Sequence, residues 1–307
     1  MVLGSGEKLS IYVDSKVFGS SVHGEMLRCG DCHSEKTGYP HDSKPFSSRR
    51  DLAVAYYEQC KSCHFANYTK TLDGVHYAVM AKGNLAAALC VDCHGSHDIR
   101  RASEPRTRIS QTCSHCHAPV YQTYSASVHG KAAEEGNPDV PVCTDCHRAH
   151  DILDPRDGSL ALRTPEICGR CHVNGKLMQK YGLSTKVVDT YLKDFHGMSA
   201  SLQRVSKPDR RVFAAVCTDC HGVHDIQSSS DPKAHTIKAN LVQTCRKCHA
   251  GATRNFPDSW LSHYEPTPHK AATVWAVQLF YTLIIPFVVG GLILQIALHL
   301  WRVVVNR

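Results

Sequence analysis

The chain has 307 residues, and 35 Lys and Arg against 28 Asp and Glu give it a formal net charge of +7. No block of Lys and Arg with interleaved aromatic residues occurs, so the positive charge does not indicate a nucleic-acid-binding surface. Ahead of an apolar C-terminal segment, the chain lacks long periodic runs of apolar residues, which excludes an ordinary hydrophobic core.

Residues 1–20 form an N-terminal segment, and eight copies of Cys-x-x-Cys-His follow. Each copy is typical of a covalent c-type haem site, in which both thiols form thioethers to the porphyrin and the histidine binds the iron. The motifs use all sixteen cysteines, namely Cys29, Cys32, Cys60, Cys63, Cys90, Cys93, Cys113, Cys116, Cys143, Cys146, Cys168, Cys171, Cys217, Cys220, Cys245 and Cys248. The proximal iron ligands are then His33, His64, His94, His117, His147, His172, His221 and His249. The motifs therefore predict eight c-type haems.

Other interpretations of paired cysteines fit this chain less well. Zinc ribbons do not require a histidine directly after every second cysteine, yet all eight copies have one. A disulfide framework is expected in a much shorter secreted chain, and a thioredoxin-type redox site occurs singly on a βαβ unit. Haem is therefore the preferred interpretation.

Residues 21–265 divide into four repeats, at about 21–73, 74–126, 127–193 and 194–265. Each repeat holds a histidine after Val or Phe, a first Cys-x-x-Cys-His motif, a His-Asp pair and a second motif. Three stretches, CVDCHGSHDI, CTDCHRAHDI and CTDCHGVHDI, are nearly identical. Repeats of this size usually stack against their neighbours, so we expect an octahaem domain built from four two-haem repeats.

The composition also predicts the fold class. About 33 residues are available for each haem, which is too little polypeptide for a separate protein core. We therefore expect a mostly α-helical and irregular fold, in which short helices and loops surround the haems. One C-terminal transmembrane helix completes it.

Each iron needs a sixth ligand or keeps an open position. Nine further histidines are candidate distal ligands: His23, His41, His76, His97, His129, His150, His196, His224 and His263. Because His97 lies only three residues after His94, it cannot reach the opposite face of the same haem, and we expect it to bind a neighbouring one. Nine candidates for eight irons leave one histidine spare. The aspartate after His97 and its equivalents either orients the imidazole through Nδ1 or stabilises a turn.

The segment of residues 266–307 is predicted to be a membrane anchor. From Ala271 to Trp301 the chain has no Asp, Glu, Lys or Arg, and this run exceeds the roughly 20 residues that span a bilayer. Gly291, Gln295 and His299 are spaced to share one helix face. This polar face either packs against a partner subunit or brings His299 to a b-type haem or a quinone.

In these motifs and their doubling, the chain resembles the multihaem cytochromes c. With its single span, it is similar to membrane-anchored electron-transfer subunits of quinone-linked respiratory complexes. That resemblance implies an integral membrane partner that is quinone-reactive or a b-type cytochrome, and a periplasmic or extracellular redox partner. The absence of a repeated methionine favours low-potential bis-histidine haems.

Thioether attachment places the haem domain on the periplasmic or extracytoplasmic side of the cell membrane. Arg302 and Arg307 after the span agree with a cytoplasmic C-terminus. Residues 1–20 show no basic stretch followed by an apolar stretch, so we expect a leader that precedes these residues in the translated protein.

Two other functions stay open from the sequence alone. One is a reductase or oxidase of a small nitrogen or sulfur compound, which would need one open haem iron. The other is a structural or storage protein that holds electrons on its haems. The expected function is electron transfer, since the histidines suffice to close all eight irons.

Overall fold

The computed structural model describes residues 1–34, 46–101, 104–206, 213–260 and 263–306. Over these residues the fold consists of short helices joined by turns and loops, with two isolated β-bridges and no β-strand. The prediction of a mostly helical and irregular fold is confirmed.

The helices of the first half of the chain are all short. They are α1 (Ser15–Gly19), α2 (Cys29–Cys32), α3 (Arg49–Ala55), η2 (Tyr57–Ser62), α4 (Phe65–Leu72), α5 (Val75–Ala81), α6 (Cys90–His94), α7 (Thr107–Ser114), α8 (Ala118–Ser125) and α9 (Val128–Glu134). The second half continues with α10 (Cys143–His147), α11 (Gly158–Leu162), α12 (Thr164–His172), α13 (Gly175–Lys180), α14 (Val187–Lys193), α15 (Phe195–Ser206), α16 (Cys217–His221), α17 (Lys238–Arg246), η3 (Phe256–Ser259) and α18 (Ala272–Val305).

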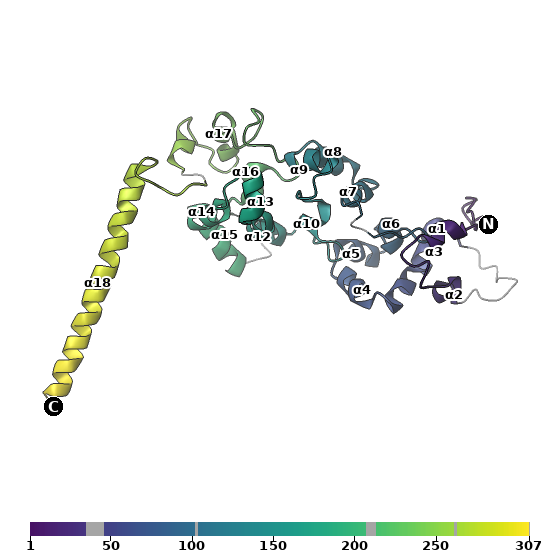
Figure 1. The fold of residues 1–307 in the computed structure, drawn as a ribbon, viewed down its shortest axis with the longest axis horizontal. Coiled ribbons are helices and arrows are strands. Elements are labelled where there is room, and N and C mark those ends of the chain that lie inside the picture. The colour runs from purple at the N-terminus through teal and green to yellow at the C-terminus, as the bar shows by residue number, and fades with distance from the viewer. Residues whose placement is uncertain (35–45, 102–103, 207–212, 261–262, 307) are drawn as a thin grey trace.

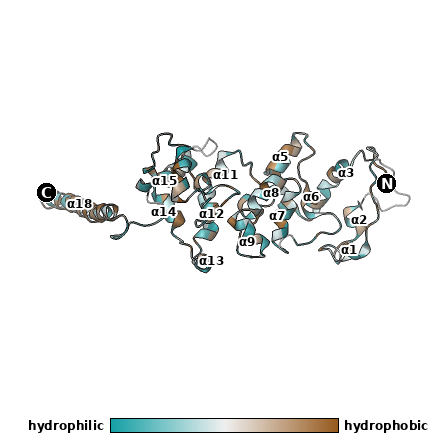
Figure 2. Ribbon diagram, turned by 90° about the horizontal axis from the view of Figure 1, so that it is seen from above, coloured by the Kyte–Doolittle hydropathy of each residue, from teal (hydrophilic) through white to brown (hydrophobic). Residues whose placement is uncertain are grey.

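The helices before α18 form an elongated body that follows the chain from one end to the other (Figure 1). The N-terminus lies at one end of this body, and α18 departs from the opposite end. Figure 2 shows the same elongated arrangement from above. The contacts between helices are chiefly between elements that are close in the chain.

The polypeptide alone forms little hydrophobic core. Its buried hydrophobic residues are scattered along the body, and the one cluster among the described residues joins Leu162, Ala200 and Val216. In Figure 2, hydrophilic and hydrophobic residues alternate over short distances within the helices. Such a chain needs additional apolar material between its helices, as the haem-packed fold predicts.

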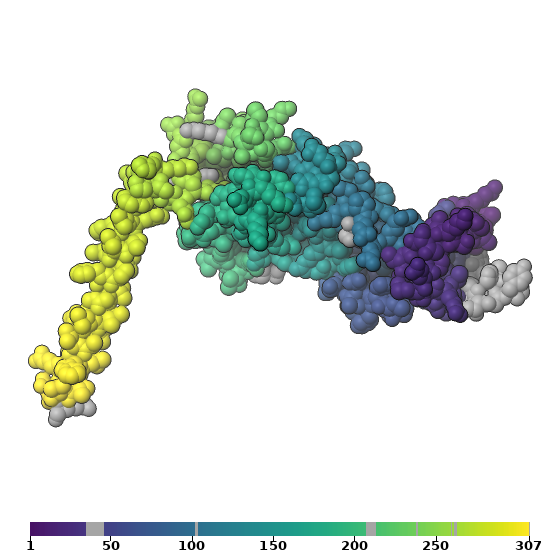
Figure 3. Space-filling model, viewed as in Figure 1, coloured from purple at the N-terminus to yellow at the C-terminus, as the bar shows by residue number. Residues whose placement is uncertain are grey.

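Helix α18 differs from all the others. It has 34 residues, is long and apolar enough to cross a membrane, and none of its side chains is buried against the rest of the chain. Figure 3 shows that it extends away from the body. Pro286 lies inside the helix. An apolar helix of this length with no buried side chain is unfavourable in water, so it requires a lipid or protein environment.

Candidate functional site: paired histidines along the body

The Cys-x-x-Cys-His motifs occur in two local conformations. The first motif of each predicted repeat forms a helix of its own that begins at its first cysteine: α2, α6, α10 and α16. In each of these helices the aspartate between the cysteines accepts a hydrogen bond from the backbone N–H of the residue before the helix. The distance is 2.7 Å from Leu89 to Asp92 and 2.6 Å from Val142 to Asp145. The carboxylate thereby satisfies a backbone donor at the start of the helix.

The second motif of each predicted repeat lies at or near the end of a helix or 3-10 helix that begins before it. Cys113 lies in the last turn of α7, Cys168 lies in α12 and Cys245 lies in α17. His64 and His117 then directly precede α4 and α8. The histidines of these two motifs are thus held between two helical segments.

Each of the eight motif histidines faces one histidine from elsewhere in the chain. The pairs, with the distance between ring centres, are His23 and His64 (6.0 Å), His33 and His97 (6.1 Å), His76 and His117 (6.2 Å), His94 and His150 (6.2 Å), His129 and His172 (6.4 Å), His147 and His224 (5.9 Å), His196 and His249 (6.3 Å), and His221 and His263 (6.0 Å). Every motif histidine has its own partner, and no partner is used twice.

This spacing fits an iron ion between the two rings. An imidazole nitrogen binds a first-row transition metal at about 2 Å and the ring centre lies about 1 Å further away, so two axial imidazoles have centres roughly 6 Å apart. No group of three or more His, Cys, Asp or Glu side chains in the described residues could hold a metal ion by itself. A porphyrin supplies the remaining four ligands, so the histidine pairs suit haem iron.

The pairing follows a fixed rule along the chain. The histidine that opens a predicted repeat pairs with the second motif of the same repeat, as in His76 with His117. The histidine of a His-Asp pair instead pairs with the first motif of the preceding repeat, as in His97 with His33. Each of these His-Asp pairings therefore crosses a boundary between two of the predicted repeats.

The ends of the array show how this rule is completed. His221 belongs to the first motif of the last predicted repeat, so no later His-Asp histidine exists for it, and His263 takes that place. His41, the remaining candidate, lies outside the described residues. The described candidates thus account for one partner for each motif.

Backbone hydrogen bonds between the predicted repeats align these histidines. The residue before the opening histidine donates to the carbonyl of the isoleucine after the His-Asp pair of the next repeat. These bonds join Val22 to Ile99 (2.9 Å), Val75 to Ile152 (2.8 Å) and Val128 to Ile226 (2.8 Å). Two ligand-bearing segments from adjacent repeats are thereby fixed side by side.

A glycine follows the opening histidine in three of the four predicted repeats, at Gly24, Gly130 and Gly197. A Cβ atom at Gly130 would lie 2.6 Å from Cα of Ser125, and one at Gly197 would lie 2.8 Å from Cα of Leu192. Only a residue without a side chain permits this close approach of two backbone segments. The second repeat has Tyr77 at this position.

The aspartates of the His-Asp pairs stabilise turns. Asp225 accepts a hydrogen bond from the backbone N–H of Val223 at 3.1 Å, and Asp151 forms an ion pair with Arg148. Arg148 and Gly222 have positive φ angles of 66° and 83°, and they follow the motif helices directly. Of the two roles predicted for these aspartates, the contacts favour the turn.

Burial favours the neutral form of several of the paired histidines. Burial, together with the nearby ring of His172, lowers the pKa of His129 to about 4. Burial also lowers the pKa of His94, His147 and His221, with a smaller contribution from their partner rings. A neutral imidazole is the form that binds a metal.

The cysteines show how consecutive motifs are arranged. The thiols of Cys60 and Cys90, Cys113 and Cys143, and Cys168 and Cys217 lie close enough together to shift each other's pKa, and each pair joins the second motif of one predicted repeat to the first of the next. The motifs of neighbouring repeats therefore lie next to one another in chain order.

The two motifs within a repeat are also close to each other. Burial raises the pKa of Cys32, and the nearby thiol of Cys60 adds to this rise. Burial likewise raises the pKa of Cys220 to about 11, with a smaller contribution from Cys245. All sixteen cysteines are free of disulfides.

Trp260 has a role that no sequence motif indicates. Its indole N–H donates to Asp194 at 3.1 Å, and its ring meets those of His196 and His263 edge to face at 6.4 and 5.9 Å. Trp260 thus contacts partner histidines of both motifs of the last repeat. The one sequence signal for this contact is that Trp260 lies three residues before His263, a candidate iron ligand.

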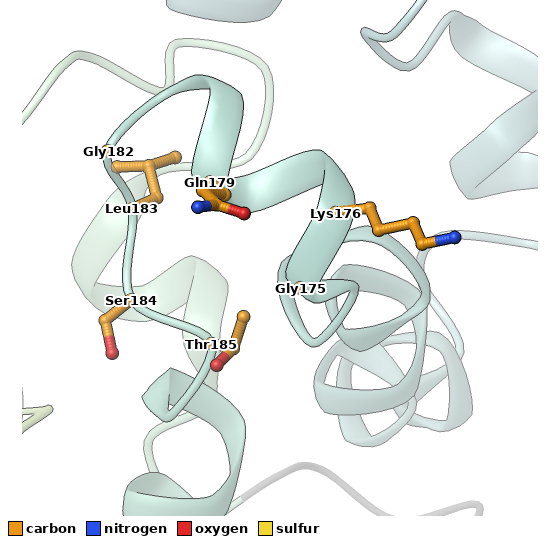
Figure 4. A pocket seen from close by; sticks show the side chains of 7 residues that line it. All are labelled: Gly175, Lys176, Gln179, Gly182, Leu183, Ser184 and Thr185. Carbon is orange, nitrogen blue, oxygen red and sulfur yellow. The ribbon is translucent and has the colours of Figure 1, made fainter.

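A surface depression lies away from the paired histidines. It has a volume of about 690 Å³ and is lined by Gly175, Lys176 and Gln179 of α13 and by residues 182–185 of the following loop (Figure 4). None of the motif residues lines it.

His299 lies on exposed α18 with Gly291 and Gln295, far along the chain from every pair.

Comparison with protein families identifies one region. Residues 82–173 match the family model of cytochrome c3. Four of the Cys-x-x-Cys-His motifs, from Cys90 to His172, lie within this match. Neither the comparison with curated proteins nor that with solved structures finds a match. The matched region is therefore similar to a multihaem cytochrome of the c3 type, a family that implies covalently bound c-type haems and electron transfer.

Proposed function

We propose that this protein is a membrane-anchored octahaem c-type cytochrome. It passes electrons along a chain of low-potential bis-histidine haems between a membrane quinone module and a periplasmic or extracellular redox partner. The observation that carries this proposal is the set of eight histidine pairs, one for each motif, at ring distances of 5.9–6.4 Å.

The residues of the chain have separate tasks in this proposal. The cysteines fix each porphyrin, and the motif histidine with its partner binds the iron from both sides, as His94 and His150 would do. The haem supplies the one-electron chemistry, whereas the polypeptide controls ligation, spacing and exclusion of water. Because consecutive motifs are adjacent, each bound haem has neighbours to which an electron can pass.

The shape of the molecule supports transfer between two distant partners. The motifs follow one another from the N-terminal end of the body to the end from which α18 departs (Figure 1). In the proposed orientation, the last repeat lies nearest the bilayer and the first repeat is the most distant. The membrane partner is then a polytopic subunit that oxidises or reduces quinone, and the soluble partner meets the first repeat.

No contact among the described residues favours the alternative function, a reductase with an open haem iron. Each motif histidine already has a second histidine at ligand distance, so both axial positions would be filled. A wholly low-spin absorption and magnetic spectrum agrees with the electron-transfer proposal. A high-spin signal that shifts on addition of nitrite or hydroxylamine would favour the enzyme.

The direct test uses the full chain in its native membranes. After mild detergent extraction, we expect a polytopic quinone-reactive subunit to copurify with the haem protein. In membranes, an added quinol should reduce the haems, seen as a rise of their α-band absorbance, and a quinone-site inhibitor should prevent this. Reduction that is equally fast without any partner, or absent with every quinol, would contradict the proposal.

His299 permits a separate prediction about the anchor. If it contacts a quinone or a b-type haem, His299→Leu should remove quinol-dependent reduction or a b-type absorbance signal. Gln278→Leu, a polar-to-apolar change elsewhere on α18, is the matched control. Unchanged reduction with lost copurification of the partner would instead assign the polar face of α18 to helix packing.

A further inference from the structure

Helix α15, in the last predicted repeat, carries an exposed apolar face. Phe195, Met198, Leu202 and Val205 are 79%, 55%, 71% and 85% exposed. Their spacing of three, four and three residues places them along one side of the helix. These four residues are called the α15 stripe.

The α15 stripe points away from the haem sites. On the same helix, Ala200 belongs to the buried cluster with Leu162 and Val216, and Gly197 approaches the backbone of α14. At about 100° per residue, the stripe lies roughly opposite His196 and Ala200. A haem bound at His196 and His249 would therefore leave the stripe exposed.

The stripe occurs at the open end of the array. In the earlier repeats, the backbone N–H of the residue equivalent to Phe195 donates a hydrogen bond to the next repeat. Two of these equivalent residues, Val22 and Val128, are 37% and 38% exposed. Phe195 has no later repeat beside it. Its larger and more apolar side chain is also twice as exposed.

The position of α15 relative to the anchor indicates what covers the stripe. The helix lies in the part of the body nearest α18, on the side toward which α18 extends (Figures 1 and 3). His263 still belongs to the body through its contact with His221, and about eight residues, 264–271, connect it to α18, so α15 stays close to whatever surface α18 enters.

We propose that the α15 stripe contacts the lipid surface of the membrane in which α18 is anchored. Amphipathic helices bury Phe, Leu and Met in the boundary between head groups and acyl chains. Because the anchor makes this contact intramolecular, a small apolar surface suffices. This inference rests on the membrane anchorage in the proposed function.

A second copy of the chain is a less suitable occupant. A stable interface usually buries about 800 Å² on each partner and involves roughly 20–30 residues a side. Four side chains on a helix of 12 residues provide much less. Lipid contact would also hold the motifs at Cys217 and Cys245 at the bilayer surface, within reach of a membrane-embedded redox partner.

The test uses the full haem-loaded chain in vesicles of phosphatidylcholine and phosphatidylglycerol that contain a photoactivatable lipid. Labelled peptides are then identified by mass spectrometry. We expect label in residues 195–206 as well as in α18. The double substitution Leu202→Ser and Val205→Ser should lower the label in α15 several-fold and leave the label in α18 unchanged. Leu183→Ser, at a side chain 46% exposed in the loop after α13, is the matched control and should change neither.

Two outcomes separate this inference from the proposed anchorage. Label in α18 without label in α15 overturns the lipid contact and leaves the anchor intact, and so does a dimer in detergent that the double substitution dissociates. Absence of label from both helices overturns the anchorage as well. Haem absorbance of each variant shows whether the body is still folded.

Discussion

At the scale of single residues, the arrangement depends on the second histidine of each pair. The ring of His150 lies 6.2 Å from that of His94, although the two residues belong to different predicted repeats. The local motif identifies His94, but only the folded chain identifies its partner. From its position in the sequence alone, His150 could equally well bind the iron of the haem at His117.

Replacement of His150 tests this pairing. His150→Ala should convert one haem from low-spin to high-spin, because its iron loses an axial ligand, and the other haems should keep their spectra. Absorbance and electron paramagnetic resonance measure the change. His115→Ala removes a histidine between two motif cysteines and should have no such effect. An unchanged spectrum in the His150 variant would contradict the pairing.

Gly130 provides a second test at this scale. A Cβ atom at this position would lie 2.6 Å from Cα of Ser125, so Gly130→Ala must move the start of α9 and His129 with it. We expect a lower free energy of unfolding by about 1–3 kcal/mol and a partly high-spin haem. Gly175→Ala is the control, since a Cβ atom added there would have no neighbouring atom within 4 Å. Equal effects of both substitutions would exclude a positioning role for Gly130.

At the scale of elements, the first motif of each repeat is a single helical turn that needs its own stabilisation. Asp145 accepts a hydrogen bond from Val142 and pairs with Arg106 from the preceding repeat. Asp92 and Arg50 form the equivalent ion pair at 2.6 Å. The aspartate thus stabilises the start of the motif helix and also connects this helix to a neighbouring element.

Removal of this aspartate should destabilise its motif. Asp145→Ala is expected to lower the free energy of unfolding by about 0.5–2 kcal/mol, since a helix-start acceptor is lost. Thermal unfolding followed by circular dichroism measures the change. Asp189→Ala removes an exposed carboxylate that pairs with Lys193 on α14, and its effect should be smaller. A larger effect at Asp189 would show that the motif aspartate does not stabilise its helix.

Local features of this chain can be predicted from its sequence alone, whereas contacts between distant residues cannot. A Cys-x-x-Cys-His motif is local, so the covalent sites and the apolar α18 are evident from neighbouring residues. The partners of His33 and His221 come from residues 64 and 42 positions later, and such distances are set by the turns and hydrogen bonds between repeats. Trp260 and the α15 stripe depend on tertiary placement and have no sequence motif.

At the scale of the whole molecule, the described residues form no continuous core from polypeptide alone. Its buried cluster joins Leu162, Ala200 and Val216, whereas the histidine pairs extend over nearly the whole body. The haems would therefore supply most of its stability, because only the folded chain would bury the apolar porphyrins and bring the partner histidines to their irons. The match of residues 82–173 to cytochrome c3 agrees with this dependence on haem.

Production of the chain without haem attachment tests this dependence. The haem-free polypeptide should show no cooperative thermal transition and should be digested rapidly by protease outside α18. The haem-loaded protein prepared in the same detergent is the control. A compact, protease-resistant and colourless chain would show that the polypeptide folds without its haems.

The most direct measurement is the intact mass of the denatured protein, since thioether bonds survive denaturation. We expect a mass that exceeds that of the polypeptide by eight haems, one for each motif. A smaller number of attached haems would contradict the octahaem array.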